Sequence, residues 1–280
     1  MPYIKLMRPH HYIKSIVLIF MSLVLSGELL NVRILVLSAW ALIVFCMISS
    51  AIYVINDISD VERDRRHSRK KNRPIASGKV SVRNAWILAA FLVAVTCVIN
   101  YLICGGNFWA WACIGLYFGA NVAYSRGLKN VPIIDVAILA LGYTLRLFYL
   151  SSVTGLDLPK WIYLTVMTMA LYLGLYKRRN EIKRQTGETR EVLKFYNYDF
   201  LDKNMYVCYV MTLVFYTLLA VNSHKELVWS VPVLCLAGLK YSLNTENDTS
   251  DNPADTLFKD KVLMVLTVLF VGLVIGLIYI

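Results

Sequence analysis

Nine apolar runs, several of them close to the length that spans a bilayer, constrain this chain more than any other feature. A transmembrane helix needs about 20 consecutive apolar residues, and 58% of the residues are hydrophobic against 17% that are charged. We therefore expect an all-α, polytopic membrane protein with nine transmembrane helices in a single domain over residues 1–280. The runs lie at residues 15–30, 33–55, 84–104, 107–124, 131–151, 160–176, 205–221, 227–242 and 262–280.

Two long loops carry most of the basic residues. Residues 56–83 hold nine Lys and Arg against four acidic residues, and residues 177–204 hold eight against five. Cytoplasmic loops are enriched in Lys and Arg, so we expect the N-terminus and both loops in the cytoplasm. This predicts a multi-pass protein of the cell (inner) membrane with a cytoplasmic active site. The net charge of +11 suits anionic lipids and anionic substrates, and we expect no nucleic-acid partner.

The first long loop begins with an acidic cluster. If the preceding helix continues past Asn56, then Asp57, Asp60 and Asp64 have the spacing i, i+3 and i+7 and share one face. Like charges at that spacing repel each other, and Mg²⁺ bound to carboxylates and substrate phosphates relieves the repulsion. The bases that follow are suited to the rest of a polyphosphate. A solvated loop beside the membrane is the alternative, but it explains only the bases.

Two further groups lie on the same predicted face. Arg8 and Lys14 precede the first run, where they could contact phosphate or could anchor the chain at the membrane surface. The turn from Tyr124 to Lys129 offers the Ser125 hydroxyl and the Lys129 amine to a sugar phosphate, or it merely closes the loop. The residues leave both interpretations open.

Charged residues also occur within and after later runs. Ionised groups inside a span are costly and usually face a bundle interior, so Arg146 is a candidate site residue, unless it reaches the far interface. Lys177 and Glu181 have the i, i+4 spacing of a surface salt bridge, which is the simpler alternative to a site role. The six cysteines lie in apolar segments without a CxxC pair, and we interpret them as core residues.

The acidic loop resembles a known family. The pattern Asn56-Asp57-x-x-Asp60-x-x-x-Asp64, followed by Asn72-Arg73-Pro74-Ile75-x-x-Gly78, is similar to the first aspartate-rich signature of the UbiA superfamily of intramembrane prenyltransferases. The resemblance implies a nine-helix bundle with a Mg²⁺–diphosphate site under a cytoplasmic cap. It also implies that Asn56 joins the three aspartates as a metal ligand.

The second signature of the superfamily is different in this chain. Aromatic prenyltransferases have another aspartate-rich motif after the sixth span, where this chain reads Lys177-Arg178-Arg179-Asn180-Glu181. The basic motif resembles the branch of decaprenyl-phosphate phosphoribosyltransferases. Further matches to that branch are Arg8 to Lys14, Tyr124 to Lys129, Ile134-Asp135 with Arg146, and Asn252-Pro253-Ala254-Asp255, whereas His10 and Asn72 depart from it.

This resemblance implies transfer of 5-phosphoribose from phosphoribosyl pyrophosphate to a polyprenyl phosphate. It implies that Asp57, Asp60 and Asp64 act through Mg²⁺, and it is compatible with a homo-oligomer, a trimer in that branch. The implied substrate-binding residues are Arg8, Lys14, Asn56, Lys70, Arg73, Tyr124, Ser125, Lys129, Arg146, Lys177, Arg178 and Glu181, with Thr189, Arg190 and Tyr196 as outlying candidates.

Two other functions remain open. A UbiA-type prenyltransferase acting on an aromatic acceptor would use a prenyl diphosphate, and the basic motif at Lys177 argues against it. A non-enzymatic carrier of an anionic lipid accounts for the basic loops but not for three aligned acids.

Overall fold

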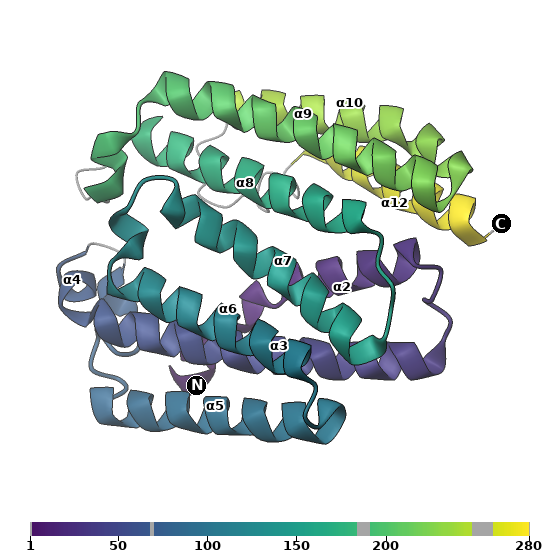
Figure 1. Ribbon diagram of the computed structural model, residues 1–280. Coiled ribbons are helices and arrows are strands. Elements are labelled where there is room, and N and C mark those ends of the chain that lie inside the picture. Colours follow the sequence, from purple (N-terminus) through teal and green to yellow (C-terminus); the bar gives the residue numbers. More distant parts are fainter. Residues whose placement is uncertain (1, 68–69, 184–190, 248–259, 280) are drawn as a thin grey trace. The chain divides into compact units, whose positions relative to one another are not determined.

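A computed structural model describes residues 2–67, 70–183, 191–247 and 260–279. Within these ranges the chain is helical and contains no strand, as predicted (Figure 1). The long helices are α2 (Ile13–Leu25), α3 (Val32–Ser59), α5 (Val82–Cys104), α6 (Phe108–Arg126), α7 (Ile134–Thr154), α8 (Lys160–Lys183), α9 (Tyr198–Ser223), α10 (Val231–Asn247) and α12 (Lys261–Tyr279). Short helices and 3-10 turns lie at α1 (Pro2–Met7), η1 (Pro9–His11), α4 (Val61–Arg66), η2 (Lys70–Asn72), η3 (Leu128–Asn130), η4 (Glu191–Phe195) and η5 (Lys225–Ser230).

Each predicted run overlaps one long helix, and six segments in the described part of the chain are long and apolar enough to cross a membrane. They are α3, α5, α7, α9, α12 and the segment Lys225–Asn244. Helix α2, with 13 residues, is shorter than a bilayer span. Helices α6 and α8 have 19 and 24 residues, but polar side chains interrupt them. The chain is an integral membrane protein, and the ninefold crossing stays a prediction.

The chain divides into two compact units, which are described separately. Unit 1 comprises residues 1–23, 28–138 and 145–157, and unit 2 comprises residues 24–27, 139–144 and 158–280. In unit 1, α3 packs against α5, α6 and α1. In unit 2, α9 packs against α8 and α10, and α10 packs against α12.

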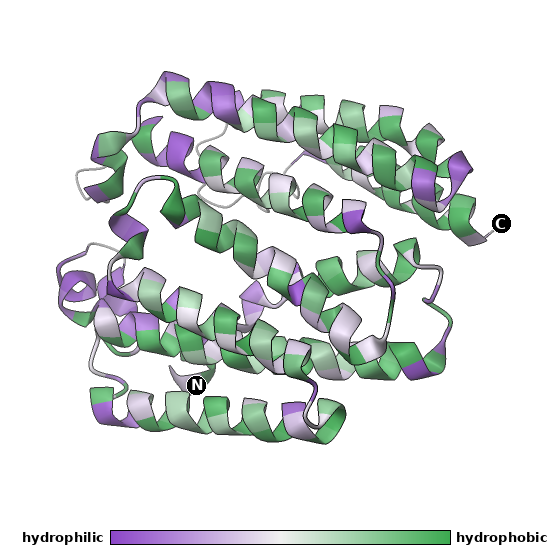
Figure 2. Ribbon diagram, viewed as in Figure 1, coloured by the Kyte–Doolittle hydropathy of each residue, from purple (hydrophilic) through white to green (hydrophobic). Residues whose placement is uncertain are grey.

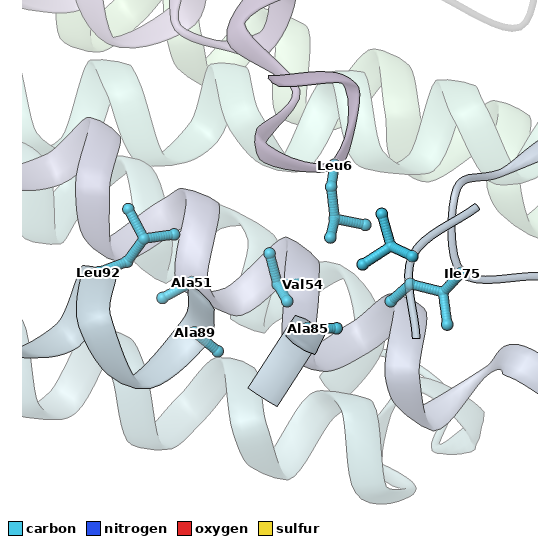
Figure 3. Packing of buried hydrophobic residues seen from close by; sticks show 8 residues of the cluster. Leu6, Ala51, Val54, Ile75, Ala85, Ala89 and Leu92 are labelled. Atoms are coloured by element: carbon cyan, nitrogen blue, oxygen red, sulfur yellow. The ribbon is translucent and has the colours of Figure 1, made fainter. Parts of the chain in front are cut away.

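Small side chains join α3 to α5 in unit 1. Ala51 of α3 lies beside Ala89 of α5, and Val54 lies beside Ala85; each of these four side chains is at most 2% exposed (Figure 3). Such small residues allow the backbones of membrane helices to approach closely. Ile75 and Val80, from the segment between η2 and α5, are buried in the same cluster. Their burial anchors the loop that carries Arg73.

The polar residues at one end of unit 1 lie around α4. Figure 2 shows hydrophilic residues there and hydrophobic residues along α3 and α5. Gly78, in the segment before α5, has a φ of +74°, a conformation that glycine adopts without steric cost. The fold therefore places the predicted acidic loop at the end of α3, over a buried apolar base.

Aromatic side chains fill much of the core of unit 2. Tyr172 and Tyr176 of α8 and Met205 of α9 are buried together, with Tyr209 and Tyr241 packed around them. Gly238 of α10 has no side chain and so leaves room for the Tyr209 ring of α9.

Candidate active site

The acidic cluster forms at the junction of α3 and α4. The predicted helix ends at Ser59, and a new short helix starts at Val61. The hydrogen-bond pattern nevertheless continues, because the Asp60 amide donates to the Asn56 carbonyl at 3.0 Å and the Asp64 amide donates to the Asp60 carbonyl at 2.8 Å. Although the helix is interrupted at Asp60, Asp57 and Asp64 therefore stay close enough to contact the same arginine.

Arg73 connects the two outer acids. Its Nη1 donates to Asp57 Oδ1 at 3.1 Å and to Asp64 Oδ2 at 2.6 Å. Asp57 and Asp64 are 3% and 1% exposed, whereas the Arg73 side chain is 26% exposed. A buried carboxylate needs a partner, and one guanidinium serves both. The prediction that these two acids share a face is confirmed.

Three more bases pair with the acids. Arg63 Nη2, from α4 itself, lies 3.0 Å from Asp60 Oδ2. Arg8 Nη2 donates to Asp57 Oδ1 at 2.5 Å, and Lys129 Nζ donates to Asp60 Oδ1 at 2.8 Å. Arg8 has a φ of +54°, which is uncommon for a residue other than glycine, and its guanidinium also lies over the Tyr53 ring at 5.2 Å. The site thus draws bases from the N-terminal segment, from the loop before α5 and from η3.

The cluster has the chemistry of a magnesium site. Its oxygen donors suit Mg²⁺, and Asp64 Oδ1 is buried without a hydrogen-bond partner in the described part of the chain. A buried carboxylate oxygen in that state is costly, and a cation would satisfy it. Across the described ranges, no three His, Cys, Asp or Glu side chains already converge on one metal position. Bases occupy the space between the acids instead.

The other predicted substrate-binding residues of unit 1 make different contacts. Asn56 is half-buried at the end of α3. The amide of Lys70 donates to His67 Nδ1 at 3.4 Å. The Ser125 hydroxyl donates to the Asn121 carbonyl within α6 at 3.0 Å. Tyr124, one residue earlier, is half-buried, and Lys14 is exposed on α2.

Arg146 points into the interior of unit 1. Its Nε donates to Ser15 Oγ at 3.0 Å, and its Nη2 donates to Tyr117 Oη at 2.8 Å and to Ser49 Oγ at 3.4 Å. The guanidinium also lies over the rings of Tyr117 and Phe45. Arg146 therefore ties α7 to α2, α3 and α6 through hydroxyl and aromatic groups.

The basic motif at the end of α8 belongs to unit 2. Arg178 Nη1 donates to Glu181 Oε2 at 2.7 Å. Glu181 therefore forms an ion pair with the residue three positions before it, whereas the sequence pointed to Lys177, four positions before it. Arg178 is 1% exposed and Glu181 is 22% exposed. The buried member of this pair is the base.

Arg179 is a buried residue that the sequence interpretation missed. It donates to Asp202 Oδ1 at 2.7 Å and to Glu246, and it lies over the Tyr198 ring. Burial alone would lower the pKa of Arg179, but the hydrogen bond to Glu246 and the nearby Asp202 raise it above its usual value. Its spacing in the motif gave no signal, because the partners come from α9 and α10.

Some predicted residues contribute differently or fall outside the described ranges. Tyr196 is buried in a small apolar cluster with Val192, Leu193 and Leu201. Four of the residues or segments noted in the sequence lie outside the ranges that the structure describes: Arg69 of the first basic loop, Thr189, Arg190 and Asn252 to Asp255.

The chain is similar to known proteins over most of its length. Residues 15–267 match the UbiA prenyltransferase family. A decaprenyl-phosphate phosphoribosyltransferase of Corynebacterium glutamicum is 30% identical over 289 aligned positions, which cover 99% of this chain and 86% of that protein. A protein of the same name from Mycobacterium tuberculosis is 26% identical, covering 97% of this chain and 92% of the relative.

A solved structure shares the fold. A UbiA homolog from Archaeoglobus fulgidus, bound to DMAPP and Mg²⁺, superimposes with a TM-score of 0.74 at 19% sequence identity, and the match covers 100% of both chains. The predicted resemblance is confirmed, and the chain is a membrane-embedded transferase that belongs to the UbiA prenyltransferase family.

Proposed function

We propose that the protein transfers 5-phosphoribose from phosphoribosyl pyrophosphate to a polyprenyl phosphate of decaprenyl type, with release of pyrophosphate and with Mg²⁺ as cofactor. The observation that carries the proposal is the contrast between buried acids at the end of α3 and a buried base at the end of α8. A metal-bound diphosphate suits the acids, and a lipid monophosphate suits the bases. The names of the relatives in Corynebacterium and Mycobacterium support the same reaction.

The donor binds at the α3–α4 junction. Asp57, Asp60 and Asp64, with Asn56, hold Mg²⁺, which supplies positive charge to the diphosphate and so makes it a better leaving group. Arg73, already beside two of these acids, binds phosphate oxygens as a bidentate fork.

Other bases of unit 1 surround the donor. Lys129, paired with Asp60, lies close enough to the metal ligands to bind the 5-phosphate or the diphosphate. Lys70 adds a second cation, and Tyr124 and Ser125 present hydroxyls to the ribose. Arg8 joins this group as well, because its contact with Asp57 places it at the donor's metal ligands.

The acceptor uses the remaining bases. Lys177 and Arg178 neutralise the lipid monophosphate, with Glu181 orienting Arg178 through their ion pair. Lys14 lies exposed at the start of α2, a position suited to an anionic lipid head group. Arg146, whose guanidinium donates to Ser15 and Tyr117, is a further proposed substrate ligand.

The reaction requires no strong general base. The bond from ribose C1 to the pyrophosphate oxygen breaks, the pyrophosphate leaves with the electron pair, and C1 gains oxocarbenium character. An oxygen of the lipid phosphate, already anionic, then forms the new bond to C1. Positioning and charge stabilisation by Arg73, Lys129 and Arg178 supply most of the catalysis.

The topology is part of the same proposal. We infer nine membrane crossings in one domain, a cytoplasmic N-terminus and catalytic loops at 56–83 and 177–204 that face the cytoplasm. This orientation gives the soluble donor access from the compartment where nucleotide precursors are made. A homo-oligomer, such as a trimer, is compatible with it.

Two parallel reactions with different donors test the function. Purified protein is incubated with Mg²⁺, polyprenyl phosphate and phosphoribosyl pyrophosphate, and in parallel with a prenyl diphosphate and hydroxybenzoate. Mass spectrometry of the lipid fraction is expected to show a phosphoribosylated polyprenyl phosphate in the first reaction only. A prenylated aromatic product would replace this proposal with the second function considered above, and no product in either would favour a carrier.

A further inference from the structure

Each acid of the cluster is already neutralised by a base. Asp57 pairs with Arg8 and Arg73, Asp64 pairs with Arg73, and Asp60 pairs with Lys129 and with Arg63. Arg63 is 57% exposed, and the three less exposed bases, Arg8, Arg73 and Lys129, match the three carboxylates in charge. The bases therefore occupy the role that a metal ion would otherwise have.

Burial shows which partner is exchangeable. The side chains of Asp57 and Asp64 are 3% and 2% exposed, while those of Arg8 and Arg73 are 18% and 26% exposed. At Asp57 and Asp64 the acid is therefore the buried member of the pair and the base is the more exposed one. Asp60 and Lys129 are similarly exposed, at 11% and 13%. A long, partly exposed side chain changes partners at lower cost than a buried carboxylate moves.

Neither ligand alone fits this balanced cluster. A metal ion that binds by itself must displace the bases and leave their positive charges beside its own. A diphosphate that binds by itself must draw the bases away and leave buried carboxylates without a partner, which is costly. When both arrive together, the metal takes the carboxylates and the phosphate oxygens take the bases, so every charge keeps a partner.

We propose that Arg8, Arg73 and Lys129 neutralise the acids whenever no ligand is bound, so that the enzyme binds a metal–diphosphate complex and binds neither component well alone. This inference rests on the proposed function only for the location of the diphosphate. Asp64 Oδ1, buried and unpartnered in the part of the chain that the structure describes, is the position at which the metal gains a ligand without displacing a base.

Binding measurements test the exchange without any turnover. Full-length protein in nanodiscs is titrated with Mn²⁺ followed by electron paramagnetic resonance, and with radiolabelled pyrophosphate followed by equilibrium dialysis. Each ligand is titrated alone and in the presence of the other, with correction for the complex that forms in solution. Because coupling is reciprocal, each ligand is expected to raise the affinity of the other by the same factor, about 5–150-fold.

Variants of the bases provide the decisive comparison. Arg73→Gln leaves Asp64 without its base, and Lys129→Met leaves Asp60 with the exposed Arg63 alone. In both variants free Mn²⁺ is expected to bind about 10-fold more tightly while pyrophosphate binds more weakly. A base with a purely structural role would not move the two affinities in opposite directions. Arg65→Gln is the matched control, because Arg65 loses the same charge on α4 but pairs only with Glu62 at the surface.

The outcomes separate this inference from the proposed function. Independent binding of Mn²⁺ and pyrophosphate to the wild-type protein, or variants that lose affinity for both, would overturn it. If Lys129→Met does not fold, Arg8→Gln, in the N-terminal segment, gives the same test at Asp57. Pyrophosphate is common to phosphoribosyl and prenyl donors, so the coupling is expected whichever donor the lipid assay identifies. A phosphoribosylated lipid without coupling would leave the function in place and remove the inference.

Discussion

The end of α3 and the end of α8 carry ion pairs of opposite burial. At α3 the carboxylates of Asp57 and Asp64 are at most 3% exposed, and the bases that reach them are more exposed. At α8 the guanidinium groups of Arg178 and Arg179 are at most 1% exposed, and their carboxylate partners are between 22% and 40% exposed. The buried member of each pair carries the charge that is built into the interior, and this member is acidic at α3 and basic at α8.

This difference indicates that the two regions receive ligands of opposite charge. A site whose permanent charge is negative receives a cation, and one whose permanent charge is positive receives an anion. The family signature alone shows acids in one loop and bases in another. The structure adds which of them are built into the interior.

The largest expected effect is at Asp64. Asp64→Asn removes the buried negative charge, and we expect turnover to fall by about 10²-fold or more, as for other preorganised electrostatic groups. The measurement is pyrophosphate release in the presence of Mg²⁺. Glu62→Gln on the same helix, where the side chain is 72% exposed, is the control and is expected to retain activity. Equal losses in the two variants would remove the distinction between buried and exposed acids.

The buried bases of α8 are expected to respond differently from each other. Arg178→Gln should raise the KM for polyprenyl phosphate about 10- to 100-fold, because a charge-assisted hydrogen bond contributes roughly 1.5–3 kcal/mol. Arg179→Gln should instead lower the Tm, since Arg179 joins α8 to Asp202 and Glu246. Steady-state kinetics and thermal denaturation of both variants separate the roles, and the reverse result would exchange them.

A close contact between two helices of unit 2 predicts that Gly238→Ala has an intermediate effect on stability. Unit 1 brings α3 to α5 through alanines, whereas in unit 2 a Cβ at Gly238 would lie 1.7 Å from the Tyr209 hydroxyl. Gly238→Ala is therefore expected to destabilise the protein by about 1–3 kcal/mol through overpacking.

Gly272→Ala is the matched control for that substitution. If a Cβ were added at Gly272 in α12, it would meet no atom within 4 Å in the described part of the chain, apart from the backbone of its own helix and its chain neighbours. Alanine there is expected to be neutral or stabilising by up to about 1 kcal/mol. Thermal denaturation in detergent measures both variants. Similar Tm values would mean that Tyr209 moves aside without cost.

The smallest expected effect concerns the start of α12. Asp260 accepts a hydrogen bond from the Leu263 amide at 2.8 Å and pairs with Lys240 at 3.0 Å, and these contacts hold its pKa below the ordinary value. A carboxyl whose pKa is lowered on folding stabilises the protein above its unfolded pKa, and the contribution is lost as pH falls through the folded pKa. The Tm advantage of wild type over Asp260→Asn is therefore expected to shrink as the pH falls below the ordinary aspartate pKa of 3.8. A constant difference would contradict the assignment.

The sequence predicted much of the scaffold because hydrophobic runs act locally. The run at 84–104 became α5 (Val82–Cys104), and its polar flanks mark where the helix starts and ends. The run at 160–176 became a longer helix, α8, which continues through the basic motif to Lys183. Polar residues at a helix end carry no hydrophobic signal, so the run stopped before the helix did.

The pairing inside the site could not be predicted in the same way. Arg8 is 49 residues from Asp57 and Lys129 is 69 residues from Asp60. Residue types indicated a site for a metal and phosphates, but only the packing of α1, α3 and η3 determines which base meets which acid. Arg179 was missed for the same reason, since its carboxylates come from other helices of unit 2.

The sequence separation of Asp60 and Lys129 has a consequence for synthesis of the protein on the ribosome. At 5–20 residues per second, roughly 3–14 s pass between translation of the acid and translation of its base 69 residues later. During this interval Asp60 has only Arg63, an exposed base three residues later, as a partner, so this end of the nascent α3 stays in water. The order of translation thus helps hold this end of α3 at the membrane surface until η3 has been made.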